Sequence, residues 1–143
     1  MIKRILGIDL GDKRTGVAVS DLTGTLASGL ELIEADGLTS CAKRVAAICG
    51  MMDINTAVLG YPLNMNGTRG DAALKAEKFK EILEGLADEA GRELEVVLFD
   101  ERLSTSLAHV YMNESGVKKK RGKIDMLSAS IILQNYLDSN KPQ

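Results

Sequence analysis

Three acidic residues stand where an apolar segment ends or a helical pattern begins, and together they could bind metal ions. Asp9 and Glu101 each follow an apolar run, and Asp125 opens the last helical pattern of the chain. A carboxylate at the open end of a buried strand is unfavourable unless a metal ion, another cation or water compensates its charge. Clustered carboxylates raise one another's pKa values, and their oxygens suit Mg²⁺ or Mn²⁺. The pattern predicts a site that holds two such ions and hydrolyses a phosphodiester bond.

The second acid of this set has two candidates, because Asp100 and Glu101 are adjacent. Side chains alternate between the two faces of a strand, so only one of the two can share a face with Asp9. Alternation alone leaves the choice open. Asp125 is expected in the first turn of a helix whose small residue Ala129 would allow close packing on the sheet. An ordinary first-turn acid is an equally good interpretation of Asp125.

Basic and amide side chains near these acids in the sequence predict contacts with phosphate groups. The candidates are Lys13, Arg14, Asn64, Arg69, Arg102, Lys118, Lys119, Lys120 and Arg121. A basic loop is expected at 118–123, and a solvated surface run is the alternative for it. Asn64 and Asn66 have turn formation as their alternative.

Length and composition limit the class of protein. With 143 residues, 45% of them apolar, the chain is expected to form one domain over 1–138 with a tail at 139–143. No apolar run is long enough for a membrane span, and the N-terminus lacks a signal pattern, so a cytoplasmic location is expected. The one histidine, His109, leaves little material for a histidine metal site. Cys41 and Cys49 are expected in the core.

The hydrophobic periodicity predicts an α/β protein. Strands are expected at 3–9, 15–20, 25–33, 56–59 and 94–99. Three helices are expected to have as their N-caps Thr39 or Ser40, Asp71, and Ser104 or Thr105, and a fourth is expected over 124–138. Three strands joined by short turns predict an antiparallel meander, and the alternation that follows adds two parallel strands. The result is a mixed five-stranded sheet with helices on both faces.

Four segments in order resemble the YqgF (RuvX-like) family. They are Gly7-Ile8-Asp9-Leu10-Gly11, Gly60-Tyr61-Pro62-Leu63-Asn64, Asp100-Glu101-Arg102-Leu103-Ser104-Thr105, and Ile124-Asp125 with Ala129. The resemblance implies a ribonuclease H-like fold and a bacterial cytoplasmic nuclease that matures the 5′ end of pre-16S ribosomal RNA. By motif position, it carries the catalytic, metal-binding acids over to Asp9, Glu101 and Asp125. Thr15, Tyr61 and Ser128 depart from the expected pattern without affecting these acids.

Three other functions stay open at this stage. By analogy with RuvC, the substrate could be a Holliday junction, so branched DNA stands beside an RNA precursor or a pre-ribosomal particle as partner. The segment from Gly7 to Gly11 also resembles the first phosphate loop of actin-like ATPases, although this chain has no second such loop. The third alternative is a non-catalytic nucleic-acid-binding protein, and the three acids argue against it. The oligomeric state, monomer or homodimer, is left open.

Overall fold

The structure is a computed structural model that describes residues 3–100 and 121–140, with the side chains of 121–125 outside the description. The strands are β1 (Ile5–Asp9), β2 (Arg14–Ser20), β3 (Ala27–Glu34), β4 (Thr56–Tyr61) and β5 (Glu95–Asp100). The helices are α1 (Leu38–Met52), α2 (Asp71–Glu89) and α4 (Arg121–Ser139). The helix predicted after Ser104 or Thr105 lies outside the described residues, and so does His109.

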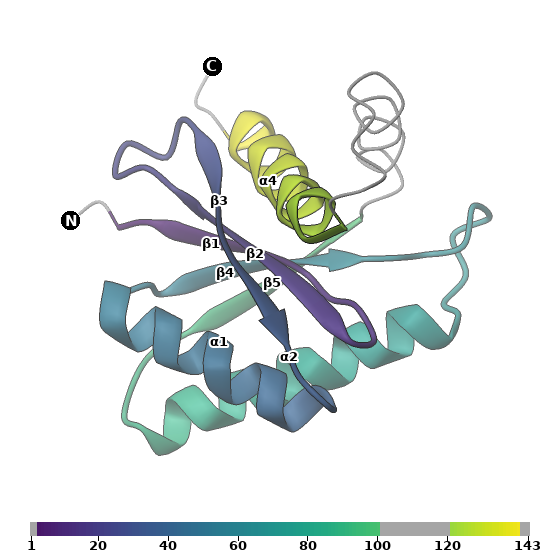
Figure 1. The fold of residues 1–143 in the computed structure, drawn as a ribbon, viewed down its shortest axis with the longest axis horizontal. Helices are drawn as coiled ribbons and strands as arrows, with labels where there is room; N and C mark the ends of the chain where they lie inside the picture. The colour runs from purple at the N-terminus through teal and green to yellow at the C-terminus, as the bar shows by residue number, and fades with distance from the viewer. Residues whose placement is uncertain (1–2, 101–120, 141–143) are drawn as a thin grey trace.

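The five strands form one mixed sheet in the order β3-β2-β1-β4-β5. β1 pairs antiparallel with β2, and β2 with β3, while β4 runs parallel to both β1 and β5. Helices α1 and α2 pack on one face of this sheet and α4 on the other (Figure 1). The predicted α/β architecture, a three-strand meander plus two parallel strands covered on both faces, is therefore confirmed.

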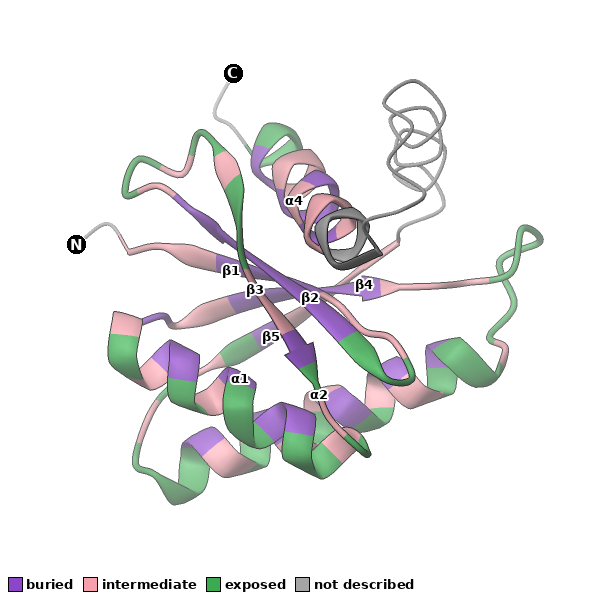
Figure 2. Cartoon of the chain, viewed as in Figure 1, coloured by how far each residue is buried: buried purple, intermediate pink, exposed green. Residues whose placement is uncertain are grey.

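Alternation along the strands divides the core into two layers (Figure 2). On β1, Leu6 and Ile8 are fully buried and pack on the side of α1 and α2. Gly7, between them, faces α4. A Cβ atom at Gly7 would lie 2.7 Å from Leu133 Cβ and 3.1 Å from the Ala129 carbonyl oxygen. The absence of a side chain at this position thus lets α4 approach the central strand closely, as the small residue at 129 predicts.

Three expected helix N-termini differ from the structure, two in the residue that caps the helix and one in the residue where the helix begins. The N-cap of helix α1 is Gly37, with a φ of 105° that glycine adopts readily, so the helix begins at Leu38 and neither Thr39 nor Ser40 is its cap. Helix α2 has Gly70 as its N-cap, so Asp71 is its first residue rather than its cap. There the carboxylate faces the positive end of the helix dipole.

The third error concerns the start of α4. This helix already includes Arg121, so residues 121–123 are helical and not part of a basic loop. Asp125 is consequently the fifth residue of α4 at the earliest, and the expected first-turn position is wrong. The dipole argument for Asp125 weakens accordingly, because that effect declines beyond the first turn.

Both cysteines are buried in α1 and unpaired by a disulfide, as expected for core residues. Burial raises the pKa of Cys49 to about 11 and also raises the pKa of Cys41. Both thiols therefore stay protonated near neutral pH, which makes them poor nucleophiles. No helix within residues 3–100 and 121–140 combines the length and the apolar character needed to cross a membrane.

Candidate active site

The carboxyl ends of three parallel strands meet at one edge of the sheet. β1 ends at Asp9, β4 at Tyr61 and β5 at Asp100. Ligands of open α/β sheets bind at this edge, because the loops and helix N-termini there leave a crevice. Polar residues at three neighbouring strand ends make this edge the candidate site.

A pocket opens at the same edge and reaches Asp9. Its walls come from the ends of β1 and β4, the β1–β2 turn and the first two turns of α2, and it encloses about 270 Å³. The charged residues that line it are Asp9, Asp12, Asp71 and Lys75. Three carboxylates and one ammonium group leave the pocket anionic, which favours a cation or a partly neutralised phosphate over a free anion.

Asp9 and Asp100 lie on opposite faces of the sheet. Asp9 follows Gly7 by two residues and so shares the α4 face. On β5, Phe99 packs in the α4 layer and Leu98 in the opposite layer, which places Asp100 on the face of α1 and α2. Between the two adjacent candidates for the second acid, Asp100 is thereby on the wrong face to join Asp9.

The structure describes four of the predicted substrate-binding residues with their side chains. Lys13 is exposed in the β1–β2 turn. Arg14 Nε lies 3.8 Å from a carboxylate oxygen of Glu34 on the neighbouring strand. The guanidinium of Arg69 is engaged by Glu77 of α2. Within the described residues, Arg14 and Arg69 each lie beside a carboxylate, whereas no ion pair involves Lys13.

The loop after β4 is held by its own side chains. Asn64 Nδ2 donates a hydrogen bond to Thr68 Oγ1 at 3.0 Å, and Asn66 Oδ1 accepts one from the Thr68 amide at 3.1 Å. The backbone closes the same turn, with the Asn64 amide 2.9 Å from the Thr68 carbonyl oxygen. Both asparagines therefore form turns, the alternative that the sequence left open. A contact of Asn64 with phosphate stays a prediction.

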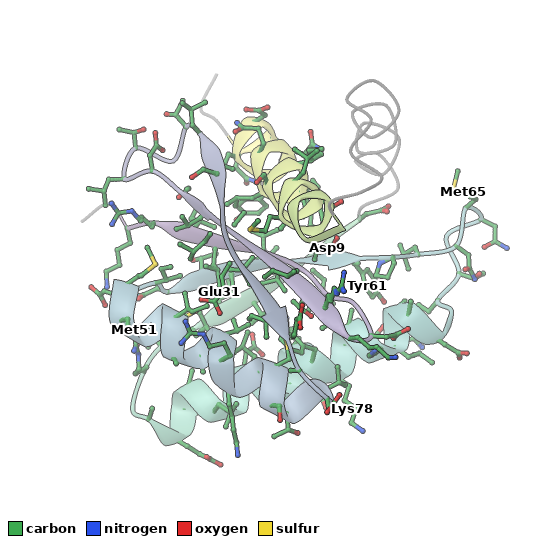
Figure 3. The ribbon with its side chains drawn as sticks, viewed as in Figure 1. Asp9, Glu31, Met51, Tyr61, Met65 and Lys78 are labelled. Carbon is green, nitrogen blue, oxygen red and sulfur yellow. The ribbon has the colours of Figure 1, made fainter. Side chains whose placement is uncertain are left out.

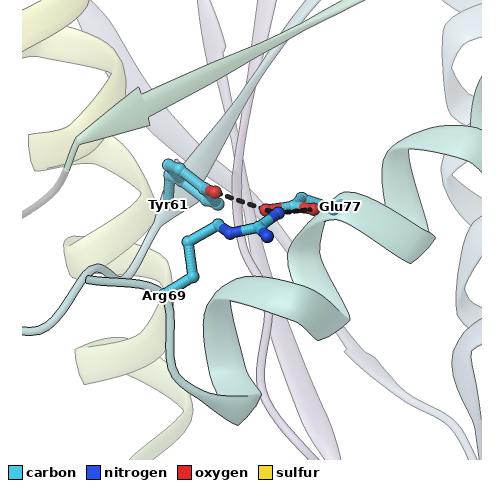
Figure 4. Close-up of polar contacts among 3 residues, drawn as sticks. All are labelled: Tyr61, Arg69 and Glu77. Atoms are coloured by element: carbon cyan, nitrogen blue, oxygen red, sulfur yellow. Dashed lines mark hydrogen bonds and ion pairs between the residues drawn. The ribbon is translucent and has the colours of Figure 1, made fainter. Parts of the chain in front are cut away.

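Glu77 joins the two ends of that loop to α2 (Figure 4). The Tyr61 hydroxyl, at the start of the loop, donates a hydrogen bond to the Glu77 carboxylate. Arg69, at its end, donates from Nη1 to both carboxylate oxygens at 2.9 and 3.1 Å. These bonds hold the pKa of Glu77 below its usual value, the Tyr61 hydroxyl being the larger cause, and Glu77 in turn raises the pKa of Tyr61. One carboxylate thus fixes a loop that borders the pocket.

Replacing Tyr61 by Phe is expected to raise the pKa of Glu77 toward its usual 4.5, because the carboxylate loses its first donor. Since the pKa is lower in the folded protein than in the unfolded chain, the contribution of Glu77 to stability is complete above about pH 4.5 and is lost as the pH falls through the folded value. The measurement is a titration of the Glu77 carboxyl carbon by NMR.

Tyr136→Phe is the matched control for that titration. Tyr136 lies on α4, where its ring packs edge-on against Phe99 at a centroid distance of 6.1 Å, on the other face of the sheet. The pKa of Glu77 should be the same in this variant as in the parent protein. An unchanged value in Tyr61→Phe as well would contradict the described hydrogen bond.

Sequence reasoning missed three members of this edge. None of the predicted site residues is Lys75, Asp12 or Glu77. A helical signal could have found Lys75 and Asp71 together, since residues four apart share one face of a helix. The partner of Lys75 lies in the β1–β2 turn, and the partners of Glu77 lie at the two ends of the loop after β4. Local spacing in the sequence does not reveal contacts between different elements.

Several predicted site residues fall outside what the structure describes. Glu101, Arg102, Lys118, Lys119 and Lys120 belong to the segment that is not described, and Asp125 and Arg121 lie in α4 with undescribed side chains. Among the described side chains, no three His, Cys, Asp or Glu residues gather as a metal site would need. That Asp9, Glu101 and Asp125 come together at one site therefore stays a prediction.

Comparison with known proteins gives matches over nearly the whole chain. The model of the family RuvX, described as Holliday junction resolvase, matches residues 3–139. Proteins of Ruminiclostridium cellulolyticum and Clostridioides difficile are 44% identical over 138 and 137 residues, covering 94% of both chains in each pair. A protein of Geobacillus kaustophilus is 45% identical over 146 residues, covering 96% of this chain and 99% of its own. All three carry the name "Putative pre-16S rRNA nuclease".

Solved structures with a similar fold include two resolvases bound to DNA junctions. RuvC of T. thermophilus, in complex with a Holliday junction substrate, superposes with a TM-score of 0.60 at 16% identity, covering 96% of this chain and 94% of that one. The Fowlpox virus resolvase, in complex with Holliday junction DNA, gives 0.59 at 13% identity, covering 95% and 97%. At these identities the likeness is one of fold, and it agrees with the predicted ribonuclease H-like architecture.

Proposed function

The chain belongs to the RuvX family, and from this membership we propose that it is a metal-dependent nuclease that hydrolyses a phosphodiester bond of precursor 16S ribosomal RNA. The observation that carries the proposal is identity of 44% over 94% of the chain with a relative named for that activity. The site geometry is compatible with it, because an acidic pocket lies at the carboxyl edge of the sheet, where Asp9 ends the central strand.

We assign the catalytic, metal-binding acids as Asp9, Glu101 and Asp125. Asp9 fits a hard divalent cation by its chemistry, since it is an oxygen donor at an anionic pocket. Glu101 is preferred over Asp100 because the latter lies on the other face of the sheet. Asp125 precedes Ala129 by one helical turn. Ala129 contacts Gly7, and Gly7 lies on the same strand and the same face as Asp9. Two ions of Mg²⁺ or Mn²⁺ would activate a water molecule and stabilise the leaving oxygen.

The remaining predicted residues would bind and orient the nucleic acid. Lys13 is exposed next to the pocket, in the same turn as Asp12, so it can contact a backbone phosphate without first losing a described partner. Arg69 would have to leave Glu77 to do so, which makes loop positioning its better-supported role. For Arg14, Asn64, Arg102, Lys118, Lys119, Lys120 and Arg121, phosphate contact remains part of the proposal. The partners are an RNA precursor or a pre-ribosomal particle in the cytoplasm.

Resolution of Holliday junctions is the second candidate function, favoured by the description of the matching family model. A junction has two-fold symmetry, and a symmetric dimer would suit it. The 2′-hydroxyl group distinguishes RNA from DNA, yet no described residue at the pocket is identified as its reader. The substrate therefore has to be established by assay.

A cleavage assay on both substrates tests the proposal. The protein is incubated with a precursor 16S RNA fragment that contains the 5′ processing site and, in parallel, with a four-way DNA junction, in Mg²⁺ or Mn²⁺. We expect cleavage of the RNA, loss of cleavage in EDTA and loss in Asp9→Asn. Cleavage of the junction alone would support the second function, and no cleavage of either substrate would favour a non-catalytic nucleic-acid-binding protein.

A further inference from the structure

Lys75 brings a positive charge to an otherwise acidic pocket. It lies in the second turn of α2, and among the described residues that line the pocket it is the one base beside Asp9, Asp12 and Asp71. Its side chain is 31% exposed, so it is partly accessible to solvent. A phosphodiester that approaches Asp9 would meet three carboxylates, and Lys75 is the group of this wall that attracts it.

Asp12 fixes the position of this ammonium group. Lys75 Nζ donates a hydrogen bond to Asp12 Oδ1, which joins α2 to the β1–β2 turn across the pocket. Lys75 accordingly lowers the pKa of Asp12, through the hydrogen bond first and through charge second, so that the carboxylate stays ionised. The contact holds Lys75 at the pocket, and at the same time it pairs the ammonium group with Asp12.

The ammonium group of Lys75 can exchange Asp12 for another anion. The Asp12 side chain is 93% exposed, and ion pairs of exposed groups contribute little to stability because water and salt screen them. A lysine ammonium carries three donors on a flexible stem, so it can turn from a carboxylate to a phosphate oxygen without a change of backbone. A nucleic-acid phosphate also releases condensed counterions when it is bound, an advantage that Asp12 lacks.

We propose that Lys75 is a positioning residue that binds a backbone phosphate of the nucleic acid, and that Asp12 is the competing anion that this phosphate displaces. The proposal rests on the proposed nuclease function, since it needs nucleic acid at the pocket. Arg69 and Arg14 are less suited to the role, because neither lines the pocket at Asp9. Lys75 then places the chain across the carboxyl end of β1, next to Asp9.

Opposite effects of two variants test this exchange. Binding is measured by fluorescence anisotropy with a labelled precursor 16S RNA fragment and a labelled four-way DNA junction, in Ca²⁺ so that cleavage does not interfere. Lys75→Met is expected to raise Kd roughly tenfold at 0.1 M salt and to make the slope of log Kd against log salt shallower by about 1, as the loss of one phosphate contact requires. Asp12→Asn is expected to lower Kd, because it removes the competitor.

Lys78→Met is the matched control. Lys78 is exposed on α2 and points away from Asp9 (Figure 3), so its loss changes the net charge equally without touching the pocket. We expect Kd within about twofold of the parent protein and an unchanged salt slope. Circular dichroism and the thermal midpoint establish that each variant is folded before it is compared.

The outcomes separate this inference from the function on which it rests. If the ion pair is only structural, Lys75→Met and Asp12→Asn change Kd in the same direction, and the inference is overturned. It is equally overturned if Lys75→Met matches Lys78→Met while the parent protein binds either nucleic acid. If the parent protein binds neither probe and cleaves neither substrate, the nuclease proposal fails and the inference fails with it.

Discussion

Asp9→Asn is expected to lower the rate of phosphodiester cleavage by about a thousandfold or more. Asp9 ends the central strand at the pocket, where it would hold the metal ions. Metal ions supply several kcal/mol of transition-state stabilisation, and about 4 kcal/mol corresponds to a factor of a thousand in rate. An amide is nearly the same size as the carboxylate but carries no charge, so the loss reports the charge rather than the packing. Single-turnover cleavage of the substrate identified by the assay above measures it.

The same variant should respond differently to metal ions in a thermal unfolding experiment. Removal of one charge from an anionic site relieves repulsion, so the midpoint of Asp9→Asn without metal should exceed that of the parent protein. Mg²⁺ should then stabilise the variant less, because a ligand that binds the folded state more weakly stabilises it less. Equal responses to Mg²⁺ in both proteins would count against a metal site at Asp9, whatever the activity.

Asp53→Asn is the matched control for both measurements. Asp53 ends α1 with a φ of 55°, a left-handed conformation that Asn adopts as readily as Asp. Its carboxylate is exposed and pairs with Lys3 at 3.3 Å, at the end of the sheet where β1 begins rather than ends. The charge change is identical, so a cleavage rate and a metal response close to those of the parent protein are expected.

The fold could be predicted from the sequence because its signals are local. Each strand is an apolar run bounded by turn residues, and the helical faces repeat every three or four residues, as at Cys41, Val45 and Ile48 of α1. Short turns within the meander then leave few alternatives for the pairing of its three strands. The helix starts at Leu38 and Asp71 were less predictable, because a glycine backbone caps both helices where side-chain caps were expected.

The contacts at the site could not be predicted in the same way, because they join elements that are distant in the chain. Lys75 meets Asp12 across 63 positions of sequence separation, and that contact exists only once α2 has packed beside the end of β1. Arg69 was predicted to meet phosphate from its basic side chain alone, whereas Glu77, one helical turn and a half inside α2, determines what it contacts. Sequence spacing predicts which residues meet within one helix or strand, whereas each contact here joins two different elements.

Glu101→Gln is expected to reduce cleavage by at least about a hundredfold, whereas Asp100→Asn should stay within about threefold of the parent protein. The two acids are adjacent, and the neighbours of Asp100 on β5 show which face of the sheet Asp100 takes. Val96 and Leu98 pack toward α1 and α2, and Asp100 follows them on that face. Asp9 is on the α4 face, two residues beyond Gly7. If the acid that shares metal ions with Asp9 comes from the same face, strand alternation predicts Glu101 rather than Asp100.

This pair of variants is its own control, because each replaces a carboxylate by an amide of the same shape at neighbouring positions. Both proteins lose one negative charge, so a general electrostatic effect on nucleic-acid binding would act on the two alike. Only a contribution to the metal site at Asp9 predicts a large difference between them. Equal rates for the two variants, or a greater loss in Asp100→Asn, would therefore overturn the assignment of Glu101 and, with it, the use of strand alternation to choose the second acid.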